Sequence, residues 1–256
     1  MSFAHTLILG FIAGGTIVLG LPVGRMTKTR PAVRQFLSAL AVGVLVFLVW
    51  DVLSHAWEPV DVAVSPDTRN IAHAFGYGAL VFAGLAVGLL SLVWFERRTI
   101  GKDAAVDTRK LSMMIAIGIG LHNFGEGLAV GNSAASGAIG LATVLVIGFA
   151  LHNATEGFGI TAPLAGGDKP SWGYLGLLGL IGGGPTLIGT LVGYKVTSEP
   201  LGVVFLSLAA GSILYVVVQL IGVAARARKT DILAVGMLIG LIAGFVTDAI
   251  VTAGGA

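Results

Sequence analysis

The chain has 256 residues, of which 55% are hydrophobic and 11% are charged, and it contains no cysteine. Soluble domains carry roughly 25% charged residues, so this composition excludes a disordered chain, a disulfide scaffold and an ordinary soluble enzyme. It indicates an integral membrane protein. Eight transmembrane helices of about 20 residues each would leave no room for a large soluble domain.

Apolar runs separated by charged, glycine and proline residues predict an all-α integral membrane protein, with one domain of eight transmembrane helices over residues 1–256. The predicted spans lie near 4–23, 35–56, 72–95, 111–131, 138–163, 173–194, 201–223 and 232–252. The first run has no basic segment before it, and its basic residues follow it. We therefore interpret it as a retained helix rather than a signal peptide.

The basic residues predict the orientation of these spans. Thirteen of the fifteen fall in the odd-numbered loops: Arg25, Lys28, Arg30, Arg34, Arg97, Arg98, Lys102, Arg109, Lys110, Lys169, Arg226, Arg228 and Lys229. The even-numbered loops hold only Arg69 and Lys195. Because cytoplasmic loops are enriched in Lys and Arg, we expect a multi-pass protein of the cell (inner or plasma) membrane with both termini external.

Glycine recurs in the sixth and eighth predicted spans. Gly236, Gly240 and Gly244 form a small-xxx-small pattern, which allows close packing of helices in lipid. The run 182–185 contains three glycines followed by Pro185, which removes a backbone donor in mid-span. Irregular backbone at that depth is typical of segments that line a cavity in transporters.

Six acidic and histidine residues lie inside predicted spans and away from the ends of those spans: Asp51, His122, Glu126, His152, Glu156 and Asp248. Such groups cost about 2.5–3.5 kcal/mol each on insertion scales, so they mark functional sites by default. Four of them belong to a short repeat. Residues 122–127 and 152–157 both read H-N-x-x-E-G, in consecutive spans.

The spacing within the repeat has a geometric meaning. Residues i and i+4 of a helix lie about 40° and one turn apart, so His122 shares a face with Glu126, and His152 shares a face with Glu156. Two antiparallel helices that face each other would bring two imidazoles and two carboxylates to one point. This donor set suits a divalent metal, zinc first, with iron, manganese, cobalt, nickel or cadmium also compatible. Asn123 and Asn153 flank the two faces, where each can add an oxygen.

The two motifs resemble those of the ZIP (Zrt/Irt-like) divalent metal transporters, in particular the prokaryotic GufA-like branch. The resemblance implies eight spans, external termini and a metal path between the fourth and fifth helices. It also implies an inverted repeat that relates helices 1–3 to helices 6–8, and a homodimer. By similarity, the main metal site would consist of His122, Glu126, His152 and Glu156. Asn123 and Asn153 would belong to an adjacent second site found in some members.

The chain departs from the family pattern in three places. Some members have an aspartate where Asn153 stands and a glutamate near Gly184, so we expect one strong metal site here rather than two. Many eukaryotic members carry a histidine-rich loop between the third and fourth helices. The corresponding loop here, 96–110, is short and has no histidine, which argues against metal sensing by that loop.

Asp51 and Asp248, together with His55, stay open to two interpretations. Asp51 and His55 are again i and i+4, at the end of the second span. Either residue would contact metal along its path, or the pair would cap a helix end. Asp248 fits a structural role and a proton-linked role equally well.

The function that we expect is uptake of a divalent cation into the cytoplasm, without enzymatic activity, an organic cofactor or a nucleic acid partner. Binding would weaken as the pH falls toward about 6.5, the ordinary pKa of histidine, because neutral imidazole is the ligand form. The alternatives are an intramembrane metal- or haem-binding protein and an intramembrane metalloprotease. The protease is disfavoured because no His-Glu dipeptide of the H-E-x-x-H kind occurs.

Overall fold

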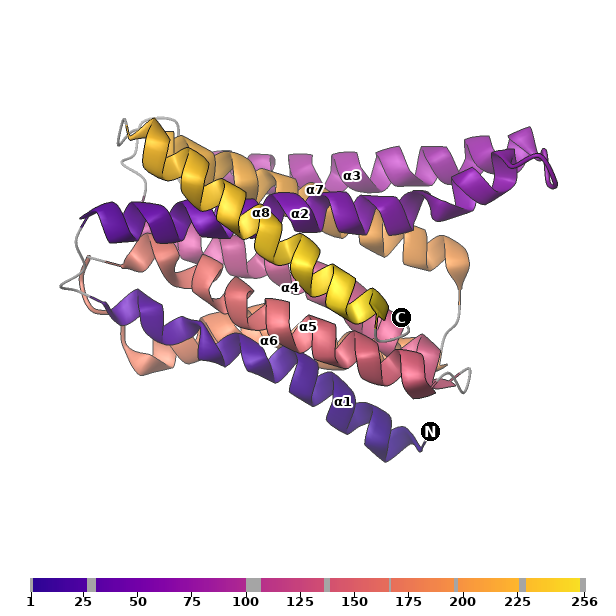
Figure 1. Ribbon diagram of the computed structural model, residues 1–256, viewed down its shortest axis with the longest axis horizontal. Helices are drawn as coiled ribbons and strands as arrows, with labels where there is room; N and C mark the ends of the chain where they lie inside the picture. The colour runs from indigo at the N-terminus through magenta and orange to yellow at the C-terminus, as the bar shows by residue number, and fades with distance from the viewer. Residues whose placement is uncertain are drawn as a thin grey trace.

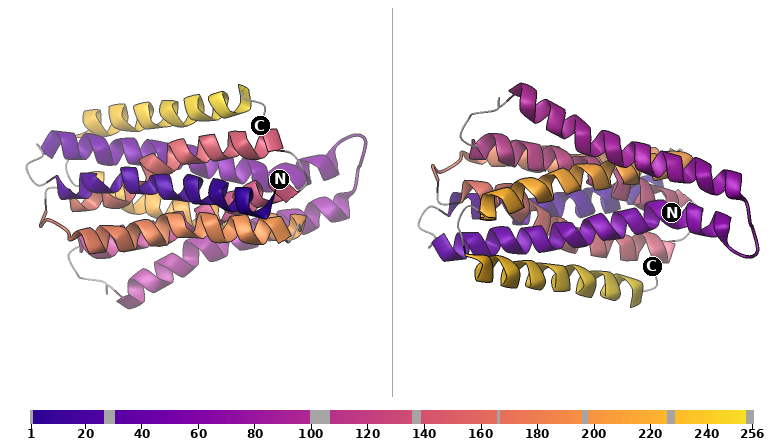
Figure 2. Two further views of the ribbon diagram at one scale, coloured as in Figure 1. Left: turned by 90° about the horizontal axis from the view of Figure 1, so that it is seen from below. Right: turned by 90° about the horizontal axis from the view of Figure 1, so that it is seen from above.

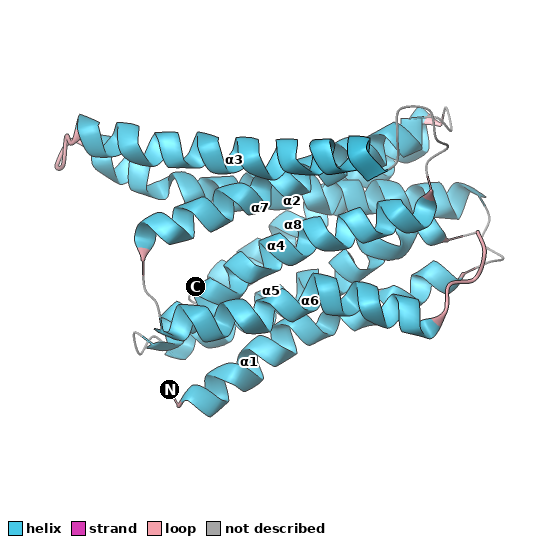
Figure 3. Ribbon diagram, turned by 180° about the vertical axis from the view of Figure 1, so that it is seen from behind, coloured by secondary structure: helices cyan, strands magenta, loops and turns pink. Residues whose placement is uncertain are grey.

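The computed structural model describes residues 2–26, 31–99, 107–135, 139–165, 167–195, 198–225 and 229–253, and nearly all of them are helical (Figure 1). The long helices are α1 (Phe3–Gly15), α2 (Pro31–Val64), α3 (Ile71–Thr99), α4 (Thr108–Ala135), α5 (Ile139–Thr161), α6 (Trp172–Lys195), α7 (Glu199–Ala225) and α8 (Thr230–Ala253). Short 3-10 helices follow α1 (Thr16–Leu19 and Leu21–Arg25) and α5 (Ala162–Leu164). The described residues include no strand, as Figure 3 illustrates.

The predicted all-α membrane fold is confirmed. Seven segments of the described chain are long and apolar enough to cross a membrane: α1 with its 3-10 extension, α2, α3, α4, α6, α7 and α8. The eighth helix, α5, is 23 residues long, although some of its side chains are outside the description. The observed helices match the predicted spans closely, except in α2.

Helix α2 is much longer than the predicted span 35–56. It continues through Pro59 to Val64, because its last turns bury Ala56, Val60 and Ala63 against the start of α3 and α7. The charged residues of this segment suggested a loop, but they lie on the exposed face of the same helix. At 1.5 Å per residue, 34 residues span about 50 Å, well beyond a hydrocarbon core of about 30 Å. The α2–α3 hairpin accordingly projects past the other helices (Figure 1).

The helices form two groups by their contacts. In one group α4 packs against α6, α6 against α1, and α5 against both α1 and α4. In the other, α2 packs against α8 and α7, and α3 against α7 (Figure 2). Helices α4 and α7 make the main contact between the groups. The expected inverted repeat would superpose the α2–α8 pair on the α3–α7 pair. The repeat itself stays a prediction.

Glycine permits the close approach of α2 and α8. A Cβ at Gly240 would overlap the carbonyl of Leu40, and one at Gly244 would overlap the ring of Phe47. The small-xxx-small pattern of α8 therefore packs against α2.

The two ends of the bundle differ in charge. Helix α1 begins and α8 ends at the same end, which we call the terminal end (Figures 1 and 2). Helix α3 ends, and α4 and α6 begin, at the opposite end (Figure 1), which we call the basic end because Arg98 is in the last turn of α3, Arg109 is in the first turn of α4 and Lys169 precedes α6. This arrangement is compatible with the predicted topology. The orientation in a membrane stays a prediction.

Candidate metal centre

The first motif lies in the middle of α4, where the helix fixes its side chains on one face. His122 Nε2 lies 2.9 Å from Glu126 Oε1, one turn further along the helix. Both side chains are almost fully buried, with 2% and 4% of their surface exposed. The predicted i, i+4 pair is therefore formed in the membrane interior.

Helix α5 brings the second motif to the same place. Glu156 Oε1 lies 3.8 Å from His122 Nε2, and the side chain of Glu156 is fully buried. Asn123 joins the two helices, because its Nδ2 donates to Glu156 Oε2 at 3.1 Å. The structure thus brings His122, Asn123, Glu126 and Glu156 together. The side chain of His152 lies outside the described residues, although its backbone is part of α5.

The asparagines of both motifs also reach helices that the sequence did not indicate. Asn123 Nδ2 donates to the carbonyl of Gly182 in α6 at 2.9 Å, and Asn153 Nδ2 donates to the carbonyl of Ala13 in α1 at 2.9 Å. Both asparagines are fully buried. Asn153 therefore binds α1, and the described contacts do not join it to the cluster around His122.

The two carbonyls lie beside the point where α1 crosses α6. Each precedes a glycine, Gly14 in α1 and Gly183 in α6, and a Cβ on either glycine would overlap the carbonyl of the other. Only glycine at both positions allows the two backbones to meet in this way. The equivalent asparagines of the two motifs thus bind equivalent places on either side of one helix crossing.

The Gly182–Pro185 run was expected to be irregular and to line a cavity, but it is continuous helix in α6. The carbonyl that Pro185 leaves without its helical donor belongs to Ile181, and it packs against Gly120 of α4. Gly183 and Gly184 instead line an apolar groove of about 650 Å³ between α1 and α6. The run meets the cluster through one atom, the carbonyl oxygen of Gly182.

The cluster is rich in negative charge. Two buried carboxylates face a single described imidazole, and Lys110, the nearest basic residue before it in α4, lies more than three helical turns away. Buried carboxylates are costly unless they are paired or coordinate a metal. A cation bound by these carboxylates is one way to offset that cost.

The distances are close to those of a shared metal ion. Two ligand atoms at about 2.0–2.1 Å from one tetrahedral zinc ion lie about 3.3 Å apart. The His122–Glu126 and His122–Glu156 distances, 2.9 and 3.8 Å, bracket that value. The side chains contact one another directly, and no three described His, Asp or Glu residues surround a common point that could hold an ion. Small side-chain rotations would be needed to admit one.

No protein-family model matches this chain, and no curated protein is a significant match to it. The interpretation of the cluster accordingly rests on its own geometry.

The described contacts do not join the three residues suggested for the metal path to the cluster. His55 Nδ1 lies 2.9 Å from the backbone oxygen of Asp51 and 3.6 Å from Asp51 Oδ1, and the imidazole is exposed near the terminal end of α2. Asp248 is half-buried in α8, and none of the described contacts joins it to the cluster. A role on the path stays a prediction for all three.

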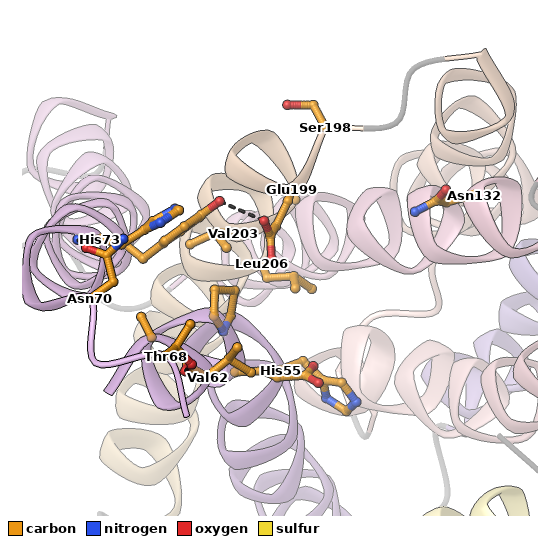
Figure 4. A pocket seen from close by; sticks show the side chains of 15 residues that line it. His55, Val62, Thr68, Asn70, His73, Asn132, Ser198, Glu199, Val203 and Leu206 are labelled. Atoms are coloured by element: carbon orange, nitrogen blue, oxygen red, sulfur yellow. Dashed lines mark hydrogen bonds between the residues drawn. The ribbon is translucent and has the colours of Figure 1, made fainter. Parts of the chain in front are cut away.

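A cavity of about 750 Å³ at the terminal end gathers His55 with polar residues that the sequence did not indicate (Figure 4). His55 and Glu58 of α2, His73 of α3 and Glu199 of α7 line it. Tyr77, also on the lining, donates to Glu199 Oε2 at 2.8 Å. These residues come from three helices and share no motif, so sequence spacing could not group them.

Proposed function

We propose that this protein is a divalent cation transporter of the ZIP-like type, which carries a metal such as zinc across the cell membrane into the cytoplasm. The proposal combines the repeated H-N-x-x-E-G motif with the burial of its side chains in a helical, membrane-compatible fold. The observation that carries it is the meeting of His122 with both Glu126 and Glu156 in the bundle interior.

The donor set favours a borderline divalent ion. Imidazole suits zinc, iron and nickel, and carboxylate oxygen also suits manganese. Without cysteine, the chain offers no thiolate, so the site has no special preference for soft ions such as Cu(I). Zinc is the first expectation, and the same residues accept iron, manganese, cobalt, nickel or cadmium.

The two helix groups suggest how the ion would move. The cluster lies in the group of α1, α4, α5 and α6, which contacts the other group mainly through α4 and α7. Transporters commonly work by rigid-body movement of one bundle against another around a mid-membrane site. In this protein, the group that holds the cluster would move against α2, α3, α7 and α8, and expose the ion to the cytoplasm.

The test is metal uptake by reconstituted liposomes. We expect the double variant His122→Ala/Glu126→Ala to insert into the membrane but to lose at least a hundredfold in zinc uptake, because two of the proposed ligands are gone. Glu156→Gln tests the contribution of α5 separately, since it removes the charge and keeps the shape.

Ser207→Ala is a matched control. It removes a buried hydroxyl whose hydrogen bond stays within α7, to the carbonyl of Val203 at 2.6 Å, so uptake should be unchanged. Wild-type uptake by the double variant would refute the proposed site. Absence of uptake of all six metals by the wild-type protein would refute the function.

A further inference from the structure

A second, smaller cavity connects the terminal-end cavity with the level of the metal cluster. It has a volume of about 210 Å³ and lies between α4, α6 and α7. Four residues line both cavities: Asn132, Ser198, Gly202 and Leu206. About six water molecules, at roughly 30 Å³ each, occupy about 180 Å³. The smaller cavity can therefore accommodate one cation with its hydration shell.

Helix α4 contributes Gly125, Leu128, Ala129 and Asn132 to the wall of this cavity. Asn132, Ala129 and Gly125 follow one another as a stripe along one face of the helix, and His122 is the next residue on that face, one turn below Gly125. Ala129 is exposed, and Gly125 has no side chain. The stripe thus leads from the terminal-end cavity to the imidazole of the cluster.

The charge of the terminal-end cavity fits a cation, whereas the smaller cavity is lined mainly by glycine and apolar side chains, with Asn132 and Ser198 as its polar residues. Glu58 and Glu199 contribute carboxylates, His55 and His73 contribute imidazoles, and none of the described lining residues of either cavity is Lys or Arg. No three of these acids and histidines are placed to hold an ion directly. The terminal-end cavity would attract a hydrated ion without stripping its water.

Leu206 of α7 lies where the two cavities approach the cluster, and it separates them from it. It lines both cavities, and its Cδ2 is the nearest atom to the space beside Gly125, 3.5 Å from where a Cβ would lie. On the same helix, Phe205 packs edge-on against Phe124 of α4, with ring centroids 4.9 Å apart. An apolar barrier of this kind holds back water and hydrated ions.

We propose that the two cavities form the access route of a hydrated divalent cation, with Glu58 and Glu199 as the residues that collect it. The ion passes along the Asn132–Ala129–Gly125 stripe of α4 between α6 and α7, and crosses Leu206 to reach His122. This route rests on the proposed transport function. It differs from a path between α4 and α5, because its walls in the terminal half of the bundle are α6 and α7.

Cysteine labelling tests the route directly, since the natural chain has no cysteine. In intact cells, we expect the Ala129→Cys variant to react with a positively charged, membrane-impermeant methanethiosulfonate reagent, and the attached group to reduce zinc uptake at least tenfold. Val130→Cys is the matched control. Val130 is the next residue of α4, is fully buried and packs with Ala13 and Val146, so it should not react.

The collecting carboxylates are tested by kinetics. For Glu58→Gln/Glu199→Gln we expect the KM for zinc to rise about three- to tenfold with kcat unchanged, and the difference to shrink at high ionic strength, because electrostatic attraction acts on the encounter step. The Tyr77 hydrogen bond can persist to the amide oxygen of the glutamine. Asp67→Asn removes a carboxylate at the same end outside the cavity lining and should leave the KM unchanged.

The outcomes separate the route from the function. If wild-type protein transports zinc but Ala129→Cys does not react, or reacts without loss of uptake, the route is wrong. An unchanged KM in the double glutamine variant would refute the collecting role of the two carboxylates. If Ala129→Cys reacts but no metal is transported by unlabelled protein, the transport function fails and the aqueous path along α4 stands.

Discussion

Asn123 and Asn153 occupy the same position in the two motifs, and each donates to a backbone carbonyl at the crossing of α1 and α6. This contact gives the asparagines a role that does not depend on metal. Their amide groups fix α6 to α4 and α1 to α5, so the helices around the cluster are tied together. The family resemblance suggests a different role, as ligands of a second metal.

Asn153 distinguishes these two roles. We expect Asn153→Ala to lower the free energy of unfolding of the metal-free protein by about 0.5–1.5 kcal/mol, because the carbonyl of Ala13 loses one donor and keeps the hydroxyl of Thr16. Asn153→Asp should destabilise the protein more than Asn153→Ala, since a carboxylate oxygen would then face that carbonyl. Thermal unfolding in detergent with a chelator measures both effects. A ligand role alone predicts a stable Asp variant that binds a second metal more tightly.

The residues of the cluster could be predicted from the sequence only in part. The i, i+4 spacing of His122 and Glu126 requires nothing but a helix, so local geometry was sufficient. The meeting with Glu156 needed α4 and α5 to pack together, and the repeat of the motif indicated this. The carbonyls of Ala13 and Gly182 could not be predicted, because every residue has a carbonyl and only the helix crossing selects these two.

Among the helices, α4 shows how glycine position decides which neighbour can approach. A Cβ at Gly127 would overlap the carbonyl of Thr186 in α6, whereas a Cβ at Gly125 would meet only the flexible end of Leu206. Glycine content alone could not separate these two positions, since they flank Glu126 symmetrically in the sequence. Their different surroundings follow from the side of α4 that each faces.

This difference predicts different effects on stability for two matched substitutions. Gly127→Ala should destabilise the protein by about 1–3 kcal/mol, because α4 and α6 must separate to admit the methyl group. Gly125→Ala should have an effect below about 0.5 kcal/mol on stability. Thermal unfolding of the two purified variants provides the comparison, and equal stabilities would contradict the packing described for α4 and α6.

The C-terminal end of helix α2 could not be predicted from the sequence. The apolar run ends near residue 56, and Pro59 with the surrounding acids suggested a loop. The helix continues because Val60 and Ala63 find partners on α3 and α7, which is a tertiary effect. As a result, Glu58 stands with His55 on the helix wall of the terminal-end cavity rather than on a loop.

At the scale of the whole molecule, the distribution of charge and the helix order agree. Helix α1 begins and α8 ends at one end of the bundle, and α3 ends and α4 begins, with their basic residues, at the other. The sequence could predict this division because each apolar run carries the chain to the opposite end of the bundle, so successive loops alternate between the two ends. The grouping of the helices could not be predicted from the sequence, since it depends on which helix faces pack against each other.

The orientation in the membrane can be measured with single cysteines. In intact cells, Asp67→Cys in the α2–α3 loop should react with an impermeant thiol reagent, because that loop is expected outside. Lys169→Cys, exposed at the basic end between α5 and α6, should react only after the cells are permeabilised. The reverse pattern would mean that the termini are cytoplasmic and that the bundle is inverted.

The crossing of α1 and α6 has one more consequence. The asparagines beside the cluster are held by main-chain atoms of residues 13 and 182, which side-chain replacement does not remove. Alanine scanning would therefore detect the asparagine donors but not the main-chain carbonyls that accept their hydrogen bonds. Substitution of the amide bond by an ester at residues 14 and 183, which weakens the preceding carbonyl as an acceptor, would make that support visible.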